Sequence, residues 1–253
     1  MLIFLGFIAY IGFLVATFPA MHAWGFFKQQ LPPIKASSIE GSVWKTNISN
    51  LQLGSMRINN VKAGLNFLPL LTGNLSINTE TTSPQYRTSS IIKIGSRSVD
   101  FSEFKAQLNA NILSKFAYPG VRLLGQLKLD FPTLTFSRNN LSYAQGTSVW
   151  NNAQIHGPLK LNLGQVVLKV NTRRKKIRGK FSSKGAADKI NGSIDILANG
   201  RYHLKISFTP SRLSAEQRSW LLTISKAGPN GSFQFSNKGN FFSKSGHQVR
   251  RTQ

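Results

Sequence analysis

The strongest constraint on the fold is a two-residue alternation of apolar and polar side chains, which recurs through most of the chain after residue 38. Leu127 and Leu129 flank Lys128, and the segment 159–163 (LKLNL) repeats the pattern. This period places apolar side chains on one face of a β-strand and polar ones on the other. Because few segments have helical periodicity, the sequence predicts a mainly β protein built from antiparallel sheet.

Three positions interrupt the alternation and predict turns or bulges. Asn199-Gly200 separates two alternating runs, a pattern typical of a two-residue hairpin with a type I′ turn and positive φ at Gly200. A similar return is expected around residues 237–239. Pro132 predicts a bulge or a break in its strand, because proline cannot donate a backbone hydrogen bond.

Two segments favour helices. Ser214 and Gln217 have the spacing of a capping box, which predicts a short helix near residues 214–226 that stops before Gly228. A single helical turn is expected near Pro69, with Gly73 ending it.

Residues 2–21 contain no charged side chain and, as a helix, would span about 30 Å, the thickness of the hydrocarbon core. Trp24, Phe26 and Phe27 follow as interfacial aromatics, and Lys28 is the first cation. We therefore expect one transmembrane helix. A cleaved signal peptide is the alternative, but the apolar run is long for one and no basic residue precedes it.

Charge does not fix the orientation of this helix. Lys28 and Lys35 follow it, so the positive-inside rule alone would leave the remaining chain in the cytoplasm, whereas long domains translocate largely regardless of charge. The chain divides into a transmembrane anchor (1–27), a linker (28–40), a β-rich domain (41–240) and a basic tail (241–253) predicted to be disordered.

Two segments of the β-rich domain resemble each other. GSVW at 41–44 is followed by LQLG and VKAGLN, and TSVW at 147–150 is followed by LNLG and VVLKVN. An internal duplication and chance similarity both explain this pattern. Trp44 and Trp150 are expected to pack into the core, with partner binding as the alternative.

The chain has 32 Lys+Arg and 8 Asp+Glu, a net charge of +24, and no cysteine. Such a surface attracts anionic lipid, lipopolysaccharide, nucleic acid or acidic proteins. The four consecutive cations Arg173, Arg174, Lys175 and Lys176 form either a solvated hairpin tip or a contact for anionic groups such as lipid phosphates. Nucleic acid is not expected as a partner, because the aromatic residues typical of single-strand binders are missing there.

No motif for catalysis or metal binding is present. The acidic residues are scattered, and no His-Glu-x-x-His, Gly-x-Ser-x-Gly or glycine-rich phosphate motif occurs. We therefore expect a protein that is not an enzyme and has no cofactor and no catalytic or metal site.

The order of several weak motifs resembles the type II secretion system protein N family (general secretion pathway protein N). An apolar start and a Leu-Pro-Pro linker precede Gly-x-x-Trp, Leu-x-x-Gly and a Pro-containing Leu-Leu-x-Gly turn. The motif residues here are Gly41, Trp44, Leu51, Gly54, Pro69 and Gly73, with Trp150 and Gly200 in later strands that also resemble the family. The resemblance covers roughly residues 1–240, and the heavy positive charge departs from the family pattern.

This resemblance implies a single-pass protein of the bacterial inner membrane with a periplasmic C-terminal domain. It also implies an accessory, non-catalytic role in exporting proteins across the outer membrane, through contacts with inner-membrane platform proteins or the outer-membrane secretin. The alternative is an AsmA-like β-groove protein that handles lipid or lipopolysaccharide. Such a groove needs an open apolar face, whereas a scaffold should close its core.

Overall fold

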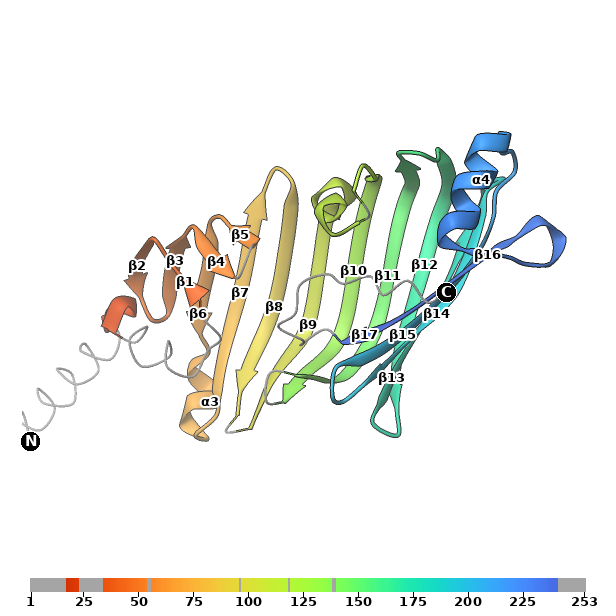
Figure 1. Cartoon of the computed structure of the whole chain (residues 1–253). Coiled ribbons are helices and arrows are strands. Elements are labelled where there is room, and N and C mark those ends of the chain that lie inside the picture. Colours follow the sequence, from red (N-terminus) through yellow and green to blue (C-terminus); the bar gives the residue numbers. More distant parts are fainter. Residues whose placement is uncertain are drawn as a thin grey trace, which may run out of the picture. The chain divides into compact units, whose positions relative to one another are not determined.

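The computed structural model describes residues 17–22, 34–53, 56–95, 97–117, 119–137 and 140–240. The chain forms two compact units, Met1–Leu108 and Asn109–Gln253, each built on antiparallel strands (Figure 1). The predicted mainly β, antiparallel architecture with few helices is therefore confirmed.

The first unit contains a main sheet with the order β2-β3-β6-β7-β8-β9 and a small sheet with the order β1-β4-β5. Its strands are β1 (Ile34–Lys35), β2 (Ser38–Ser42), β3 (Lys45–Ser49), β4 (Leu51–Leu53), β5 (Met56–Ile58), β6 (Val61–Leu65), β7 (Leu75–Ser83), β8 (Tyr86–Ile94) and β9 (Ser98–Asn109). The predicted turn at Pro69 is the short helix α3 (Phe67–Leu71). Gly73, with φ 72°, follows it.

Register explains the packing of the main sheet in this unit. Leu65, Ile77, Ile92 and Phe101 lie opposite one another across β6 to β9 and form an apolar row. Cross-strand pairs of this kind are the main unit of sheet stabilisation.

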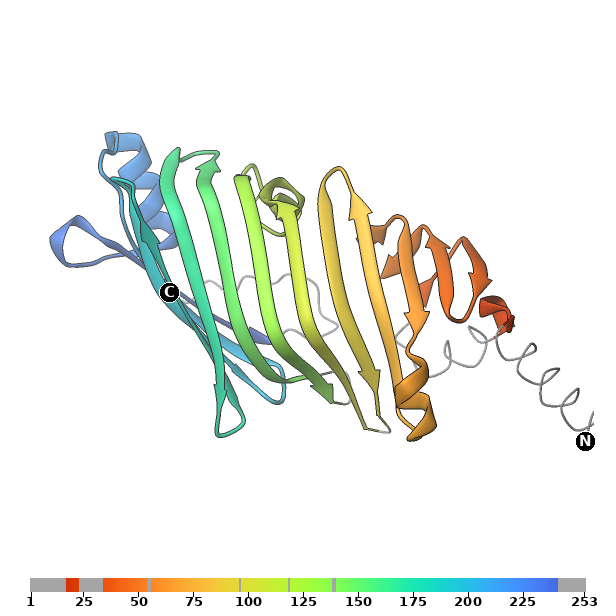
Figure 2. The same ribbon diagram turned by 180° about the vertical axis from the view of Figure 1, so that it is seen from behind.

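The second unit contains a sheet with the order β10-β11-β12-β13-β14-β15-β17-β16. Its strands are β10 (Arg122–Ser137), β11 (Asn140–His156), β12 (Leu161–Arg173), β13 (Lys176–Lys184), β14 (Lys189–Leu197), β15 (Arg201–Thr209), β16 (Lys226–Ala227) and β17 (Phe233–Asn240). Its helical segments are η1 (Ala110–Phe116), α4 (Ala215–Ile224) and η2 (Pro229–Gly231). Strands β13 to β15 and β17 turn progressively out of the plane of β10 and β11 (Figures 1 and 2).

The core of the second unit lies where α4 packs against one end of this sheet. Leu221 of α4 is 1% exposed and joins a buried cluster with Ala153, Leu159, Leu161, Leu163 and Phe233. A register shift at Gly164 and Gln165 inserts one extra residue into β12. This bulge keeps Leu163 on the same face as Val166, since one extra residue reverses the alternation.

The predicted capping box of α4 is confirmed. The Gln217 backbone N–H donates to Ser214 Oγ at 3.1 Å, and the Ser214 N–H donates to Gln217 Oε1 at 3.1 Å. The helix ends at Ile224, two residues earlier than predicted, because Lys226 and Ala227 pair with β17 as strand β16.

The turn predictions have mixed outcomes. Asn199-Gly200 does lie between two paired strands, but the type I′ assignment is wrong. Only Gly200 has positive φ (78°), and its N–H donates to the Leu197 carbonyl at 2.9 Å. This geometry fits a type I turn over residues 197–200 followed by a left-handed glycine.

The return predicted at 237–239 is also wrong, because β17 runs through these residues paired with β15 throughout. Asn237 and Gly239 do not end the strand, because the pairing with β15 satisfies the backbone hydrogen bonds of β17 at these positions. The bulge predicted at Pro132 is confirmed by a register shift between Asp130 and Thr133 within a continuous β10.

The proposed subdivision differs from the structure in two respects. Strand β1 and the start of β2 fall inside the predicted linker (28–40), and the predicted single β-rich domain (41–240) contains parts of two compact units.

The two similar segments, 41–44 and 147–150, also differ in local structure. Residues 41–44 end β2 and form its turn, whereas residues 147–150 lie within β11.

Candidate functional site

The four consecutive cations form the tip of the β12–β13 hairpin. Arg173 lies opposite Lys176, so Arg174 and Lys175 are the central residues of a two-residue turn. Their φ values, 50° and 62°, are both left-handed, as in a type I′ turn. Left-handed backbone costs about 1–2 kcal/mol for a residue other than glycine. The hairpin therefore exposes two cations at a tip where glycine or asparagine would be less strained.

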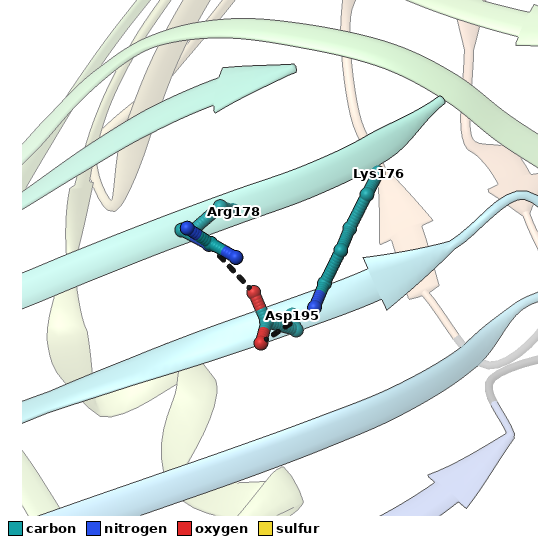
Figure 3. A network of polar contacts seen from close by, with 3 residues as sticks. All are labelled: Lys176, Arg178 and Asp195. Carbon is teal, nitrogen blue, oxygen red and sulfur yellow. Dashed lines mark hydrogen bonds and ion pairs between the residues drawn. The ribbon is translucent and has the colours of Figure 1, made fainter. Parts of the chain in front are cut away.

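One acidic residue lies beside this tip. Asp195 on β14 forms ion pairs with Lys176 at 3.0 Å and Arg178 at 3.1 Å, both on β13 (Figure 3). Partial burial disfavours the carboxylate, but hydrogen bonds and charge attraction from Lys176 and Arg178 outweigh it and lower the pKa of Asp195. Lys176 is therefore paired with Asp195 and is not a freely solvated cation of the hairpin tip.

Strand register extends the positive charge across one face of the second sheet. Lys169 lies opposite Lys180, and the same row continues through Ser193 to Lys205. Twelve cations share this cationic face: Lys128, Lys169, Arg173, Lys176, Arg178, Lys180, Lys184, Lys189, Arg201, Lys205, Lys226 and Lys238. The strand acids on the same face are Asp130 and Asp195. Sequence reasoning isolated only the tip, although the period-two spacing of Lys176, Arg178 and Lys180 could have revealed the face.

The opposite face of the same sheet is apolar. Beyond the cluster under α4 it carries half-buried side chains in matching register: Leu168, Val170, Ile194, Ile196, Leu204, Ile206 and Phe235. No described helix or strand buries these side chains as α4 buries Leu163. The sheet thus has two chemically distinct faces.

The structure brings two of the family-like motif segments together in the first unit. The ring of Trp44, in the β2–β3 turn, meets the ring of Phe67 of α3 edge to face, with centroids 5.9 Å apart. The Leu65 N–H donates to the Val43 carbonyl at 2.9 Å. Gly41 has φ 92°, and a Cβ there would lie 2.3 Å from the Lys45 carbonyl oxygen, so only glycine fits.

Pro69 lies inside α3 and Leu51 in β4. Trp150 lies within β11 and packs against the α4 cluster, and its Nε1–H donates to the Leu124 carbonyl at 2.9 Å. Trp44 is half-buried as well. The residues outside the described part of the chain are Trp24, Phe26, Phe27, Lys28 and Gly54.

Asp188 is a structural residue that sequence reasoning missed. Its carboxylate accepts hydrogen bonds from the N–H groups of Asn162 (2.8 Å) and Ser211 (2.7 Å) and from the Ser211 hydroxyl (2.8 Å). Burial raises its pKa, but these three donors together lower the pKa of Asp188 below its ordinary value. The carboxylate thereby joins the start of β12 to the loop that precedes α4. The sequence signal that could have indicated this role is the position of Asp188 as an isolated acid in a basic segment.

Among the described residues, no group of three or more His, Asp or Glu side chains is arranged to hold a metal ion. A helix long and apolar enough to cross a membrane is not found in the part of the chain that the structure describes. Most of the predicted span lies outside that part. The structure does describe the end of the predicted span, where Pro19 pairs with Ser42 in a β-bridge and Ala20 is 5% exposed.

The family model of type II secretion system protein N matches residues 32–236. A relative from Vibrio cholerae serotype O1 (strain ATCC 39315 / El Tor Inaba N16961), described as type II secretion system protein N, is 23% identical over 198 residues. That match covers 74% of this chain and 79% of the relative. No solved structure matches significantly. The chain belongs to the type II secretion system protein N family and is a component of type II secretion.

Proposed function

We propose that the protein is an accessory, non-catalytic component of the type II secretion apparatus. Residues 1–27 anchor it in the inner membrane, and the two sheet units lie in the periplasm, where they contact inner-membrane platform proteins or the outer-membrane secretin. The observation that supports this most is the family match over residues 32–236, which includes strands of both units.

Exposed apolar side chains offer a place to look for these contacts. Leu68 on α3 is 76% exposed and Phe67 is 55% exposed, beside the packed Trp44 segment. Apolar and aromatic side chains are enriched in the buried centres of protein interfaces. We therefore place a candidate protein contact on α3.

In-cell photo-cross-linking tests the proposal. A photoreactive amino acid at Leu68 should capture a platform protein or the secretin, and the same substitution at the exposed polar Thr82 on β7 is the control.

Deleting the gene should leave metabolism intact and make exported enzymes accumulate in the periplasm. A reporter fused after Gln253 should be active outside the cytoplasm. Cytoplasmic reporter activity would contradict the topology, and normal export without capture at Leu68 would contradict the function.

A second candidate is an AsmA-like groove for lipid or lipopolysaccharide. The observation that favours it is the half-exposed apolar face of the second sheet, since burial of acyl chains on such a face is favourable. Ile194 and Ser193 are neighbours in β14 with side chains on opposite faces, so they form a matched pair. Ile194→Gln should remove co-purifying lipid, as measured by mass spectrometry, while Ser193→Gln should retain it. Equal lipid content in both variants would reject this candidate.

A further inference from the structure

We propose that the cationic face of the second sheet is a docking surface for an anionic phospholipid bilayer. This proposal does not depend on which secretion proteins the chain contacts. It concerns the polar face of β10 to β17, opposite the apolar face and α4.

The first support is the concentration of charge. Residues 109–253 contain 23 Lys+Arg and 4 Asp+Glu, so this unit carries +19 of the +24 of the chain. Strand pairing places twelve of these cations on one face, eleven of them exposed and Lys176 half-buried. Each basic residue near an anionic membrane surface strengthens binding about fivefold.

The second support is that this arrangement opposes folding. Lys169 lies directly opposite Lys180 with Thr147 and Ser193 as the next residues of the row, so no acid separates the like charges. Like charges placed opposite each other destabilise a sheet. The left-handed backbone of Arg174 and Lys175 adds to this loss of folding stability. An anionic surface would neutralise the opposed charges and so remove the repulsion between them.

The third support is a place for a headgroup. A hollow of about 260 Å³ is lined by Lys176, Arg201 and Lys238, by Asp195 and His203, and by the side chains of Leu197 and Tyr202. Because Lys176 and Arg178 already neutralise Asp195, the positive charges of Arg201 and Lys238 remain for a phosphate. The chemistry that fits is a phosphodiester headgroup.

The composition of the face favours a bilayer over an acidic protein. Protein interfaces are depleted in lysine and enriched in aromatic residues at their centres. On β12 to β17 the described residues of this face are mostly polar, with Val167 and Leu197 as the apolar members, and include no Trp, Tyr or Phe; β11 adds Tyr143, whose hydroxyl donates to Gln145 Oε1 at 2.8 Å. A fluid surface of anionic headgroups can adjust to such a broad lattice of charges.

The test uses the full-length chain reconstituted into vesicles of phosphatidylcholine alone or with phosphatidylglycerol added. Because the chain has no cysteine, Asn171→Cys allows a fluorophore to be placed on the cationic face, and Ser219→Cys places it on α4. Energy transfer to a headgroup-labelled lipid then reports how close each position lies to the bilayer.

We expect energy transfer from position 171 to rise when phosphatidylglycerol is added and to fall in about 1 M salt, where the Debye length is about 3 Å. Lys169→Gln, Lys180→Gln and Lys205→Gln together should lower the equilibrium constant for docking about 100-fold, about fivefold for each charge. The control with the same charge change is Lys160→Gln, Arg212→Gln and Arg218→Gln, which lie off this face and should have little effect.

Three results would overturn the proposal. Equal loss in both triple variants would show that total charge, not this face, controls binding. Transfer independent of phosphatidylglycerol would show that anionic lipid is not recognised. Closer approach of position 219 than of position 171 would show that another surface meets the membrane.

Discussion

Asp188 provides the sharpest test of the structural argument. Asp188→Asn preserves size and removes the charge, so an amide nitrogen replaces one of the two acceptor oxygens. The remaining oxygen can still accept from Ser211, whereas the Asn162 N–H, 2.8 Å from the second oxygen, would face a donor.

The expected cost follows from these contacts. A hydrogen bond to a charged group contributes about 1.5–3 kcal/mol, and a buried donor left without a partner costs about 1–3 kcal/mol. We expect Asp188→Asn to lower the free energy of unfolding by about 2–4 kcal/mol, since the terms are not additive. Asp195→Asn on β14 is the matched control. Its ion pairs are partly exposed, so we expect a loss of about 1 kcal/mol or less.

Urea unfolding of the full chain, followed by tryptophan fluorescence, measures both changes. Trp220 and Trp150 pack against the core cluster near α4 and should report the loss of this region. A loss for Asp188→Asn no larger than that for Asp195→Asn would refute the role assigned to Asp188.

The pH dependence supplies a second check. The pKa of Asp188 is lowered in the folded state, so its stabilisation is present above the ordinary carboxyl pKa of about 4 and is lost as pH falls through the folded value. The difference between the wild-type chain and Asp188→Asn should therefore be largest near neutral pH and shrink in acid below about pH 4. A difference that stays constant into strong acid would contradict the charge-based explanation.

Three further changes test the fold by the same unfolding assay. Gly200→Val should cost at least about 1–2 kcal/mol because φ is 78° there, and an unchanged stability would mean that the turn is misassigned. Trp150→Ala should cost about 3–5 kcal/mol through lost packing and the lost bond to Leu124; a stable variant with a binding defect would instead favour a partner-binding role. Ser214→Ala should cost about 1 kcal/mol by removing the helix cap, with the exposed Ser219→Ala in the same helix as the neutral comparison.

Local patterns in the sequence were sufficient to predict several secondary-structure elements. Alternation predicted the strands because side-chain direction in a strand depends only on residue parity. The Ser214 capping box predicted α4 because its hydrogen bonds join residues three apart. Motif order predicted the family because that information lies along the chain, independent of how the strands pair.

Turn geometry was predicted less well because it depends on both flanking strands. Asn199-Gly200 has the composition of a type I′ turn, yet the pairing of Ile196 with Tyr202 leaves a longer connection in which only Gly200 is left-handed. Arg174 and Lys175, with unfavourable side chains, occupy the two-residue turn because the Arg173–Lys176 register leaves them there. Long-range pairing overrode the local preference in both cases.

The sequence by itself therefore determined the β class, the capped helix, the excess of positive charge and the family. Only the tertiary structure decided how that charge is distributed and which apolar side chains are covered. Lys169, Lys180 and Lys205 become neighbours through hydrogen-bonded pairing of separate strands, and α4 covers Leu163 but leaves Leu204 half-exposed. Register and packing join residues that are distant in sequence, so no local pattern contains them.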